Sequence, residues 1–475
     1  MSFLNDDCWL VIFKNLPIKE RVKCEVVCKR FYYILREFNK GYRNEKKIDF
    51  FSILITNFEQ LYNKEKSNYL PCISGIMKRC GNNLEEISFG KRWLSLKQDV
   101  IDEIESYTER LHYINLSGVL LLGNICKLLL KNAKTIEILN LDECHFYDDE
   151  PMKNDVSNIF EKFINLKKLY LQKNCLSLSK LYQVNKNLKV LDLTYPICFD
   201  INDFNTFLKN HLSLEELYLD GIQTLNYETI HLISNLKKLV VLEIGNLTTT
   251  ELPIISFSNI RTLKSLSINY VISIDDIILE NLLRALYNLQ NLSLTHCTNI
   301  LNYSSLKYLT NITKLTITHS NTLCNYDMEC LSQNKKLSSI KIQRCPLLTN
   351  KGMESLIKNC PLKKVEIIDC PGIGDASLYI LAKSQKIYKS ISFEGCCNVT
   401  NDGVKALAKM RSLNELINLD ISHNKNVDDS AIEELCEELR NKETKKINLL
   451  EICVKQTSVS KFVENKVNDK IYLYY

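Results

Sequence analysis

The sequence predicts an α/β solenoid preceded by a small all-helical module. Three observations support this. A short leucine-rich phrase returns about every 25 residues from Leu84 onward. A segment with helical spacing of apolar residues follows many of these phrases. The first 40 residues lack the phrase and instead carry apolar side chains at helical spacing.

The repeated phrase has the pattern L-x-x-L-x-L, and its period falls within the 20–29 residues of leucine-rich repeats. The chain therefore predicts a leucine-rich-repeat solenoid, or horseshoe. The phrase occurs as LEEISF at Leu84, LHYINL at Leu111, IEILNL at Ile136, LKKLYL at Leu166, LKVLDL at Leu188, LEELYL at Leu214, LVVLEI at Leu239, LKSLSI at Leu263, LQNLSL at Leu289, ITKLTI at Ile312, LSSIKI at Leu337, LKKVEI at Leu362, YKSISF at Tyr388 and LINLDI at Leu416.

Each phrase suits one short strand whose first, fourth and sixth side chains point into the core. A single repeat cannot bury its apolar side, so stacked repeats share one continuous core. The second half of each repeat is expected to return as a helix. Asp375, Asn401 and Asp428 stand where a side chain caps a free amide of the helix's first turn.

The repeat pattern defines four segments. Residues 1–40 form the helical module, and residues 41–83 are a linker with an irregular first repeat, in which residues 48–51 are expected as a strand and 69–80 as a helix. Residues 84–450 form the repeat array. Residues 451–475 form a C-terminal cap, with a closing strand at 471–475, because a solenoid needs capped ends.

Composition excludes several classes of protein. The 61 basic and 56 acidic residues give a net charge of +5 without a basic block, so nucleic acid is not an expected partner. No apolar stretch approaches the length of a membrane helix, and the N-terminus does not read as a signal peptide. The nineteen cysteines are odd in number and do not suggest a secreted disulfide framework. We therefore expect a cytoplasmic or nuclear protein with free thiols.

The N-terminal module is expected to contain three helices. Trp9, Ile12, Phe13 and Leu16 share one face of the first, which ends at Pro17. Pro17 also suits the first turn of a second helix, and Val27, Phe31, Ile34 and Leu35 mark the inner face of a third. So small a domain seldom folds without a partner, and size alone therefore favours an obligate partner.

These residues resemble an F-box. The positions that carry the resemblance are Leu4, Ile12, Phe13, Leu16, Val27, Cys28, Lys29 and Arg30. Two residues depart from the usual pattern, because Asn5 replaces a common proline and Phe31 a common tryptophan. The resemblance implies that the module binds an adaptor, and through it a cullin scaffold. The alternative is a helical cap that only covers the first repeat. The residues expected to bind the adaptor are Leu4, Ile12, Phe13, Leu16, Val27, Cys28 and Phe31.

The repeats resemble the cysteine-containing leucine-rich class found in F-box proteins. The ninth position is asparagine in two repeats, at Asn174 and Asn424. No C-x-x-C pair is present, so we interpret the ninth-position cysteines as packing residues and expect neither metal nor cofactor. No catalytic motif is found, and a non-catalytic protein is expected. The ninth-position cysteines are Cys144, Cys297, Cys345, Cys370 and Cys396.

A target-binding surface is expected where the third, fifth, seventh and eighth residues of each phrase face the inner curve. Tyrosine and arginine are enriched at binding hot spots, and a cationic run suits an acidic or phosphorylated segment. The alternative is that these are ordinary solvent-exposed side chains. Towards the N-terminus, Tyr170, Tyr195 and Tyr218 stand near Asp192 and Asp220. The expected target-binding residues are Tyr270, His296, Lys314, His319, Lys341 and Arg344.

The F-box resemblance and the repeat array together predict the substrate-recognition subunit of an SCF-type (cullin-RING) ubiquitin ligase, with an unidentified protein target. Two alternatives remain open at this stage. One is an intracellular repeat scaffold or inhibitor without ligase association, which would not co-purify with the adaptor. The other is a secreted repeat receptor, which conflicts with the N-terminus and the odd cysteine count.

Overall fold

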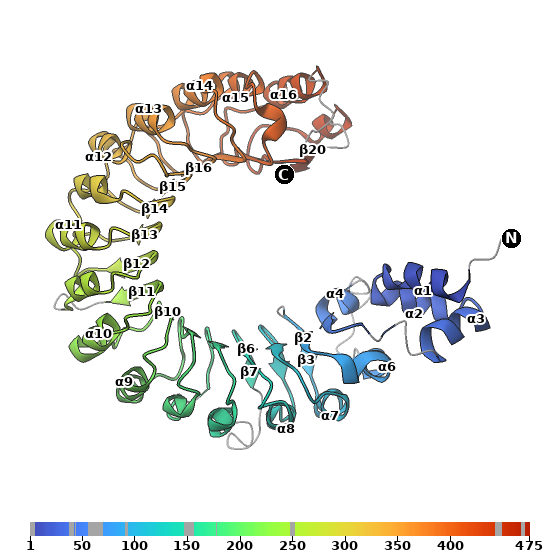
Figure 1. Cartoon of the computed structure of the whole chain (residues 1–475). Coiled ribbons are helices and arrows are strands. Elements are labelled where there is room, and N and C mark those ends of the chain that lie inside the picture. Colours follow the sequence, from blue (N-terminus) through green and yellow to red (C-terminus); the bar gives the residue numbers. More distant parts are fainter. Residues whose placement is uncertain are drawn as a thin grey trace. The chain divides into compact units, whose positions relative to one another are not determined.

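A computed structural model of the chain describes residues 5–37, 42, 44–55, 70–90, 94–146, 156–176, 178–247, 252–441, 449–466 and 471–475. Contacts divide it into two compact units, Met1–Tyr218 and Leu219–Tyr475. In each unit the strands form a parallel sheet and the helices cover one of its faces (Figure 1). We call the other face the open sheet face. No helix of the described segments is long and apolar enough to span a membrane.

The first unit begins with the helical module, whose helices are α1 (Asp6–Lys14), α2 (Ile18–Glu25) and α3 (Lys29–Tyr32), followed by the π-helical turn η1 (Tyr33–Glu37). Asn5 caps α1, because its side chain accepts a hydrogen bond from the Cys8 amide at 2.8 Å. The departure from proline at this position therefore supplies a helix cap.

The sheet of the first unit runs in the order β1–β2–β4–β6–β8–β9–β10, and every neighbouring pair is parallel. A second, small sheet joins β3, β5 and β7. The strands are β1 (Lys47–Asp49), β2 (Glu86–Ser88), β3 (Ser95–Leu96), β4 (Tyr113–Asn115), β5 (Leu120–Leu121), β6 (Ile138–Asn140), β7 (His145–Phe146), β8 (Lys168–Tyr170), β9 (Val190–Asp192) and β10 (Glu216–Leu219). The helical segments are α4 (Phe50–Ile55), α6 (Leu70–Cys80), η2 (Gly81–Asn83), α7 (Gln98–Tyr107), α8 (Cys126–Lys131), η3 (Val156–Lys162), η4 (Leu181–Gln183) and α9 (Ile201–Asn210).

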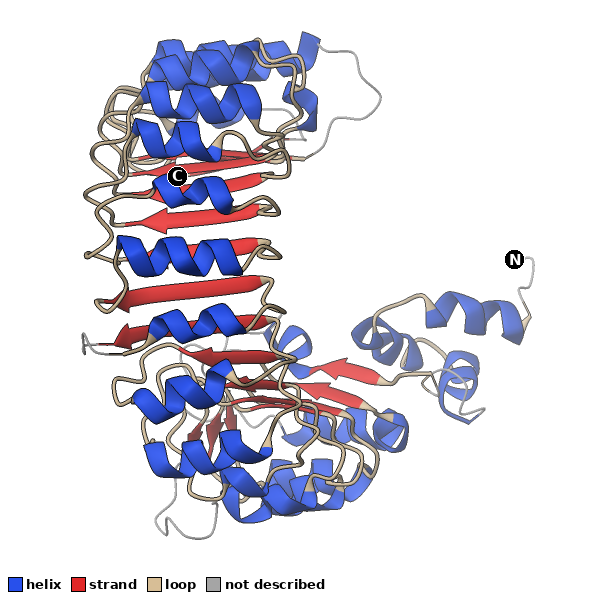
Figure 2. Cartoon of the chain, turned by 60° about the vertical axis from the view of Figure 1, so that its left-hand side comes forward, coloured by secondary structure: helices blue, strands red, loops and turns tan. Residues whose placement is uncertain are grey.

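The second unit stacks its strands in sequence order from β11 to β20, again in parallel (Figure 2). The strands are β11 (Val241–Leu247), β12 (Ser265–Val271), β13 (Asn291–Thr295), β14 (Lys314–Thr318), β15 (Ser339–Gln343), β16 (Lys364–Ile368), β17 (Ser390–Glu394), β18 (Asn418–Asp420), β19 (Leu450–Cys453) and β20 (Ile471–Tyr474). The helical segments are α10 (Tyr227–Ser234), η5 (Ile254–Asn259), α11 (Asp276–Ala285), η6 (Ser304–Tyr308), α12 (Asn325–Leu331), α13 (Asn350–Asn359), α14 (Asp375–Lys383), α15 (Asn401–Ala408), η7 (Leu413–Glu415), α16 (Asp429–Asn441) and η8 (Lys461–Lys466).

The α/β leucine-rich-repeat solenoid predicted from the phrases is confirmed. Each of the fourteen phrases coincides with a strand, and β20 forms the expected closing strand. In the phrase at Leu263, the first, fourth and sixth residues are at most 1% exposed. Leu266, Leu292 and Leu315 occupy matched positions on neighbouring strands, so equivalent side chains stack along one core.

Two local predictions are wrong. The strand expected at residues 48–51 ends at Asp49, and α4 begins at Phe50, because the Asp49 side chain accepts a hydrogen bond from the Phe51 amide. Asp375 and Asn401 are the first residues of α14 and α15 and do not cap them. Asp428 directly precedes α16 and accepts a hydrogen bond from the Ser430 amide, in agreement with the predicted cap.

Candidate functional site

The helical module has an aromatic core. Phe13 is 2% exposed, and its ring centroid lies 5.7 Å from that of Trp9 and 4.9 Å from that of Phe31. Ile34 and Leu35 are also buried. The placement of Phe13 differs from its expected role as an adaptor contact, because its side chain already fills the centre of the module. Truncating it would destabilise the module itself.

Other apolar side chains of the module face solvent. Ile12 is 40% exposed and Val27 is 66% exposed, as an adaptor-binding role requires. Val11 and Val26, at 61% and 86%, were not singled out from the sequence, because Val11 lies off the α1 face that contains Phe13 and Val26 is the residue that follows α2. So many exposed apolar groups on about 40 residues are typical of an interaction surface.

The remaining adaptor-binding candidates differ in accessibility. Leu16 and Phe31 are half-buried, whereas Cys28 is exposed. The Cys28 sulfur accepts a hydrogen bond from the Phe31 amide at 3.4 Å, which caps α3. Leu4 lies outside the described residues.

Four of the predicted target-binding residues form a ladder on the open sheet face of the second unit. The rings of Tyr270 and His296 stack with centroids 4.3 Å apart, and those of His296 and His319 stack at 3.7 Å. An Nη1–H of Arg344 lies 3.0 Å from Nε2 of His319. We call Tyr270, His296, His319 and Arg344 the stacked ladder.

The ladder follows the eighth position of successive repeats, where the backbone is left-handed. Tyr270, His296, His319 and Arg344 have φ between 51° and 55°. The His296 amide donates to the Thr318 carbonyl of the next strand, and the His319 amide donates to the Gln343 carbonyl. The left-handed turn therefore continues the interstrand hydrogen bonding while it brings side chains from adjacent repeats into register.

The stacked ladder is less cationic than the sequence suggested. Burial, followed by the Arg344 charge, lowers the pKa of His296. Burial, His296 and Arg344 likewise lower the pKa of His319, against an opposing effect of Asp369. Arg344 itself pairs with Asp369, at 3.1 Å between Nε and Oδ2. The predicted cationic run is therefore corrected: the lowered pKa values favour the neutral form of both imidazoles, and the charged guanidinium of Arg344 is paired with Asp369.

Lys314 and Lys341 provide positive charge beside the ladder. They lie on the adjacent strands β14 and β15, and no described carboxylate oxygen lies within 4.0 Å of either amine. Their neighbours in register on β12 and β13 are uncharged, and include Ser267 and Ser293. Glu366 lies opposite Lys341 on β16, but its carboxylate pairs with Lys364 at 2.6 Å. This lysine and hydroxyl surface suits an anionic group.

The open sheet face of the first unit carries acidic and tyrosine side chains. Burial, opposed in part by hydrogen bonds, raises the pKa of Asp142 to about 6, and burial also raises that of Asp192. The Tyr218 hydroxyl donates to Glu216 at 2.9 Å. Tyr170 is half-buried and Tyr195 is 43% exposed. Asp220, in the second unit, is only 9% exposed and accepts hydrogen bonds from Asn246 and Asn269, so its role is structural.

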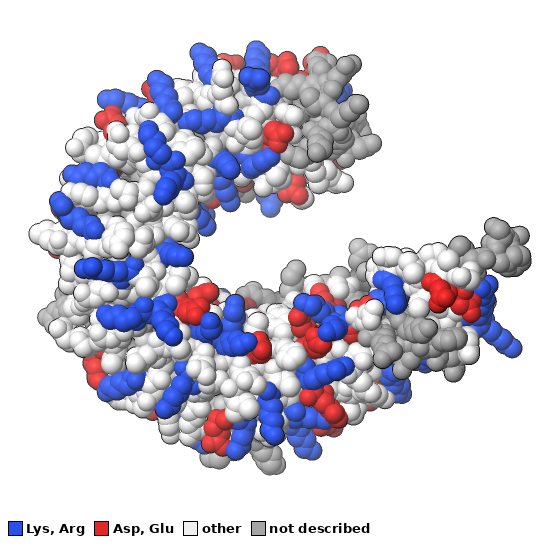
Figure 3. Space-filling model, in the orientation of Figure 1, with Lys and Arg blue, Asp and Glu red and all other residues white. Residues whose placement is uncertain are grey.

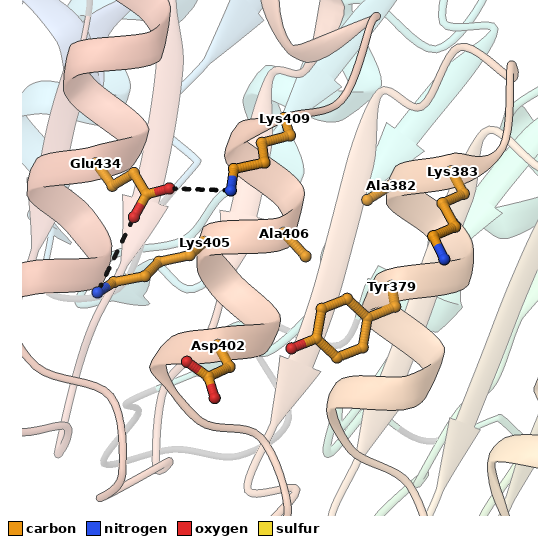
Figure 4. A pocket seen from close by; sticks show the side chains of 8 residues that line it. All are labelled: Tyr379, Ala382, Lys383, Asp402, Lys405, Ala406, Lys409 and Glu434. Atoms are coloured by element: carbon orange, nitrogen blue, oxygen red, sulfur yellow. Dashed lines mark ion pairs between the residues drawn. The ribbon is translucent and has the colours of Figure 1, made fainter.

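A groove of about 580 Å³ lies among α14, α15 and α16 on the helical side of the second unit (Figure 4). Tyr379 forms one wall, and Ala382 and Ala406 leave the space between the helices open. Glu434 pairs with Lys405 at 4.0 Å and with Lys409 at 3.7 Å. The mixed charges of this groove do not define one class of ligand.

The ninth-position cysteines are buried as predicted. Cys144, Cys297, Cys345, Cys370 and Cys396 are at most 5% exposed, and all nineteen cysteines are free thiols. The Cys345 thiol lies 3.4 Å from the Gln343 carbonyl oxygen, and burial raises its pKa to about 12. In the described parts of the chain, no three His, Cys, Asp or Glu side chains gather in a way that could hold a metal ion.

Comparison with known proteins agrees with the architecture. Residues 1–43 match the family model of the F-box domain. No curated protein matches the sequence. The chain thus consists of an F-box domain followed by a leucine-rich-repeat solenoid. By this architecture it is an F-box/leucine-rich-repeat protein.

Solved structures give weak likenesses. The complex of Rad7 and Elc1 from yeast includes a chain that is 16% identical, with coverage of 100% of this chain and 98% of the other, at a TM-score of 0.46. A leucine-rich-repeat protein of Leptospira interrogans is 18% identical, with coverage of 92% and 91%, at a TM-score of 0.42. TM-scores below 0.5 do not establish a common fold, and the fold stands on the strands and repeats described above.

Proposed function

We propose that the protein is the substrate-recruiting subunit of an SCF-type ubiquitin ligase. The F-box match over residues 1–43 carries this proposal, because F-box domains dock an adaptor that connects to a cullin scaffold. The exposed Ile12 and Val27 supply apolar surface for that contact. The free thiols fit a reducing compartment, so we place the protein in the cytoplasm, the nucleus or both.

In this proposal the protein performs no chemistry of its own. The solenoid holds a target while the adaptor and cullin hold the ubiquitin carrier, so that target lysines experience a high effective concentration of activated ubiquitin. We assign the target to the open sheet face of the second unit, at the stacked ladder and the adjacent Lys314 and Lys341. Because Lys314 and Lys341 have no carboxylate oxygen within 4.0 Å among the described residues, they support an acidic or phosphorylated segment as the bound part of the target.

The adaptor contact is tested by the double variant Ile12→Ala/Val27→Ala. Each side chain that becomes fully buried on binding contributes about 1.5–3 kcal/mol, so the variant should lose most of its adaptor during co-purification. The exposed Ile164 and Leu212 lie outside the module, and Ile164→Ala/Leu212→Ala is the matched control. Adaptor recovery equal to wild type in the module variant would contradict the docking assignment.

Phe13→Ala requires a separate readout because Phe13 is a core residue of the module. Circular dichroism and thermal melting of the variant distinguish a lost contact from a lost fold. A wild-type chain that never binds adaptor would instead favour a repeat scaffold without ligase association, in which the module only caps the first repeat.

A further inference from the structure

A buried carboxylate joins the helical module to the first repeat. Glu25, the last residue of α2, is 5% exposed. Its Oε1 accepts a hydrogen bond from the Tyr42 hydroxyl at 2.6 Å and one from Arg79 Nε at 2.9 Å. Its Oε2 accepts from Arg79 Nη2 at 2.6 Å. Arg79 belongs to α6 of the first repeat, so this bidentate pair spans 54 residues of sequence.

A second polar contact reinforces this one. Arg21, one turn earlier on α2, is 5% exposed and forms an ion pair with Glu45. Its guanidinium lies 5.5 Å from the centroid of the Tyr42 ring. Two buried charges of α2 thus bind the chain that follows the module, and Tyr42 contacts both.

The contact between Glu25 and Arg79 has a defined direction because two hydrogen bonds join a charged carboxylate to a guanidinium. Burial would raise the pKa of Glu25, but hydrogen bonds from Arg79 and Tyr42 and the charges of Arg79 and Arg36 outweigh that effect and leave the pKa below its usual value. The carboxylate is therefore ionised at neutral pH. A guanidinium fork on a carboxylate fixes the angle between its two carriers as well as their distance, which apolar packing does not.

We propose that Glu25 and Arg79, with Tyr42, are positioning residues that hold the F-box at a fixed orientation on the first repeat. A ligase that works by proximity needs a fixed geometry between the adaptor-bound module and the solenoid, because a mobile joint would spread target lysines over a larger volume. This consequence for ubiquitin transfer rests on the proposed function. The joint, meaning the contact of Glu25 and Tyr42 with Arg79 of the first repeat, does not depend on the proposed function.

The joint is tested first without any partner. Burial raises the pKa of the Cys72 thiol on α6, and the positive charge of Lys19 on α2 is close enough to oppose that rise, so an amine-to-thiol cross-linker should join the two side chains in the wild-type chain. Glu25→Gln removes the charge of the pair, and Arg79→Lys keeps the charge but loses the fork. Glu20→Gln is the control, because Glu20 forms an exposed pair with Lys23 on the same helix. Breaking a buried pair is strongly destabilising, so cross-linking should fall by at least about fivefold in Glu25→Gln, with a smaller fall in Arg79→Lys and no change in the control.

The second readout is the reconstituted ligase. The ubiquitin-modified lysines of this chain are mapped by mass spectrometry for the wild type and the three variants, together with adaptor affinity. The proposal expects Glu25→Gln to bind adaptor within about twofold of wild type but to carry modification at a broader set of lysines. Unchanged cross-linking in Glu25→Gln would overturn it. Loss of cross-linking together with an unfolded module and lost adaptor binding would reduce the pair to a folding role and would also overturn it. Failure of the wild-type chain to bind adaptor would refute the proposed function, while the cross-links would still decide the joint.

Discussion

The ninth-position cysteines show how much one residue type reveals when its position repeats. The sequence predicted Cys345, Cys370 and Cys396 as packing residues, and the structure buries all three completely. Periodicity was sufficient here because a repeat fixes the direction of a side chain without reference to distant parts of the chain.

The reactivity of these thiols follows from their burial. Cys345, Cys370 and Cys396 should resist a thiol reagent at pH 8 in the native protein, because a buried thiol with a raised pKa is neither accessible nor ionised. Cys397 is exposed and is an internal control within the same chain. Peptide mass spectrometry after timed labelling measures both rates. Labelling of the three at the rate of Cys397 would contradict their assigned direction.

The stacked ladder shows where the sequence was insufficient at this scale. The repeat length placed Tyr270, His296, His319 and Arg344 in adjacent repeats, which the structure confirms. The charge of the ladder was misjudged because Asp369, the eighth residue of the next repeat, continues the same column and pairs with Arg344. Burial of the imidazoles is also a property of the assembled sheet.

Asp142 gives a pH-dependent prediction. Its pKa is raised to about 6 by burial, so the folded state retains a proton that the unfolded state loses near pH 4. Stability therefore falls as pH rises from about 4 to about 6. Asp142→Asn keeps an oxygen to accept the hydrogen bond of the Gln172 amide and removes this loss. After allowance for solvent screening, it should stabilise the protein by about 1–2 kcal/mol at pH 7 and hardly at all at pH 4.

Urea denaturation at both pH values measures the effect of this change. Glu109→Gln is the control, since the Glu109 side chain is 79% exposed. Equal stabilisation by Asp142→Asn at pH 4 and pH 7 would show that the carboxyl group of Asp142 does not titrate as described.

At the scale of elements, neighbouring repeats are joined by the first residue of several helices. The Asp375 carboxylate accepts from the Thr400 amide at 2.8 Å and from the Thr400 hydroxyl at 2.7 Å, both in the next repeat. The Asn350 side chain accepts from the Gly374 amide in the same way, and that of Asn401 from the Asp428 amide. The sequence indicated acceptors at helix starts but gave no sign that their donors lie about one repeat later.

Removal of one such link should have a local and measurable cost. Asp375→Ala leaves the Thr400 amide and hydroxyl without their acceptor and should destabilise the second unit by about 1–3 kcal/mol. Asp402→Ala is the control, because Asp402 occupies the first turn of the next helix and is exposed. Thermal and urea unfolding of both variants provides the comparison. A loss in Asp402→Ala as large as that in Asp375→Ala would indicate helix propensity and not the link between repeats.

At the scale of the whole molecule, the repeats made the solenoid predictable from the sequence. They did not predict the contact between the helical module and the first repeat. Every phrase forms a strand because each contains its own regular spacing of apolar residues. No comparable pattern predicts the contact between Glu25 and Arg79, because the sequence does not indicate which of its 117 charged residues form ion pairs. The balanced charge is also visible on the surface, where cations and carboxylates are interspersed over the face shown in Figure 3.

Target capture is expected to depend on Lys314 and Lys341 on the open sheet face of the second unit. The sequence pointed to Lys341 and Arg344, but Arg344 is already paired with Asp369, so the sharper variant is Lys314→Glu/Lys341→Glu. A charge-assisted contact contributes about 1.5–3 kcal/mol, so reversal of both lysines should reduce capture of an acidic or phosphorylated target by tenfold or more, at about the same adaptor recovery and melting temperature.

The control for this reversal makes the same change in charge on the helical face of the unit. Lys351→Glu/Lys358→Glu alters two lysines of α13 whose side chains are 74% and 61% exposed. Proteins captured with the ligase inhibited are quantified by mass spectrometry against the adaptor, with and without phosphatase treatment. Phosphatase should lower wild-type capture to the level of the sheet-face variant if phosphate is the recognised group, and should leave it unchanged if the segment is acidic without modification. Equal capture by the sheet-face variant, the control and the wild type would exclude this face as the site of target binding, because two reversed charges at the centre of an anion-binding surface cannot be without effect.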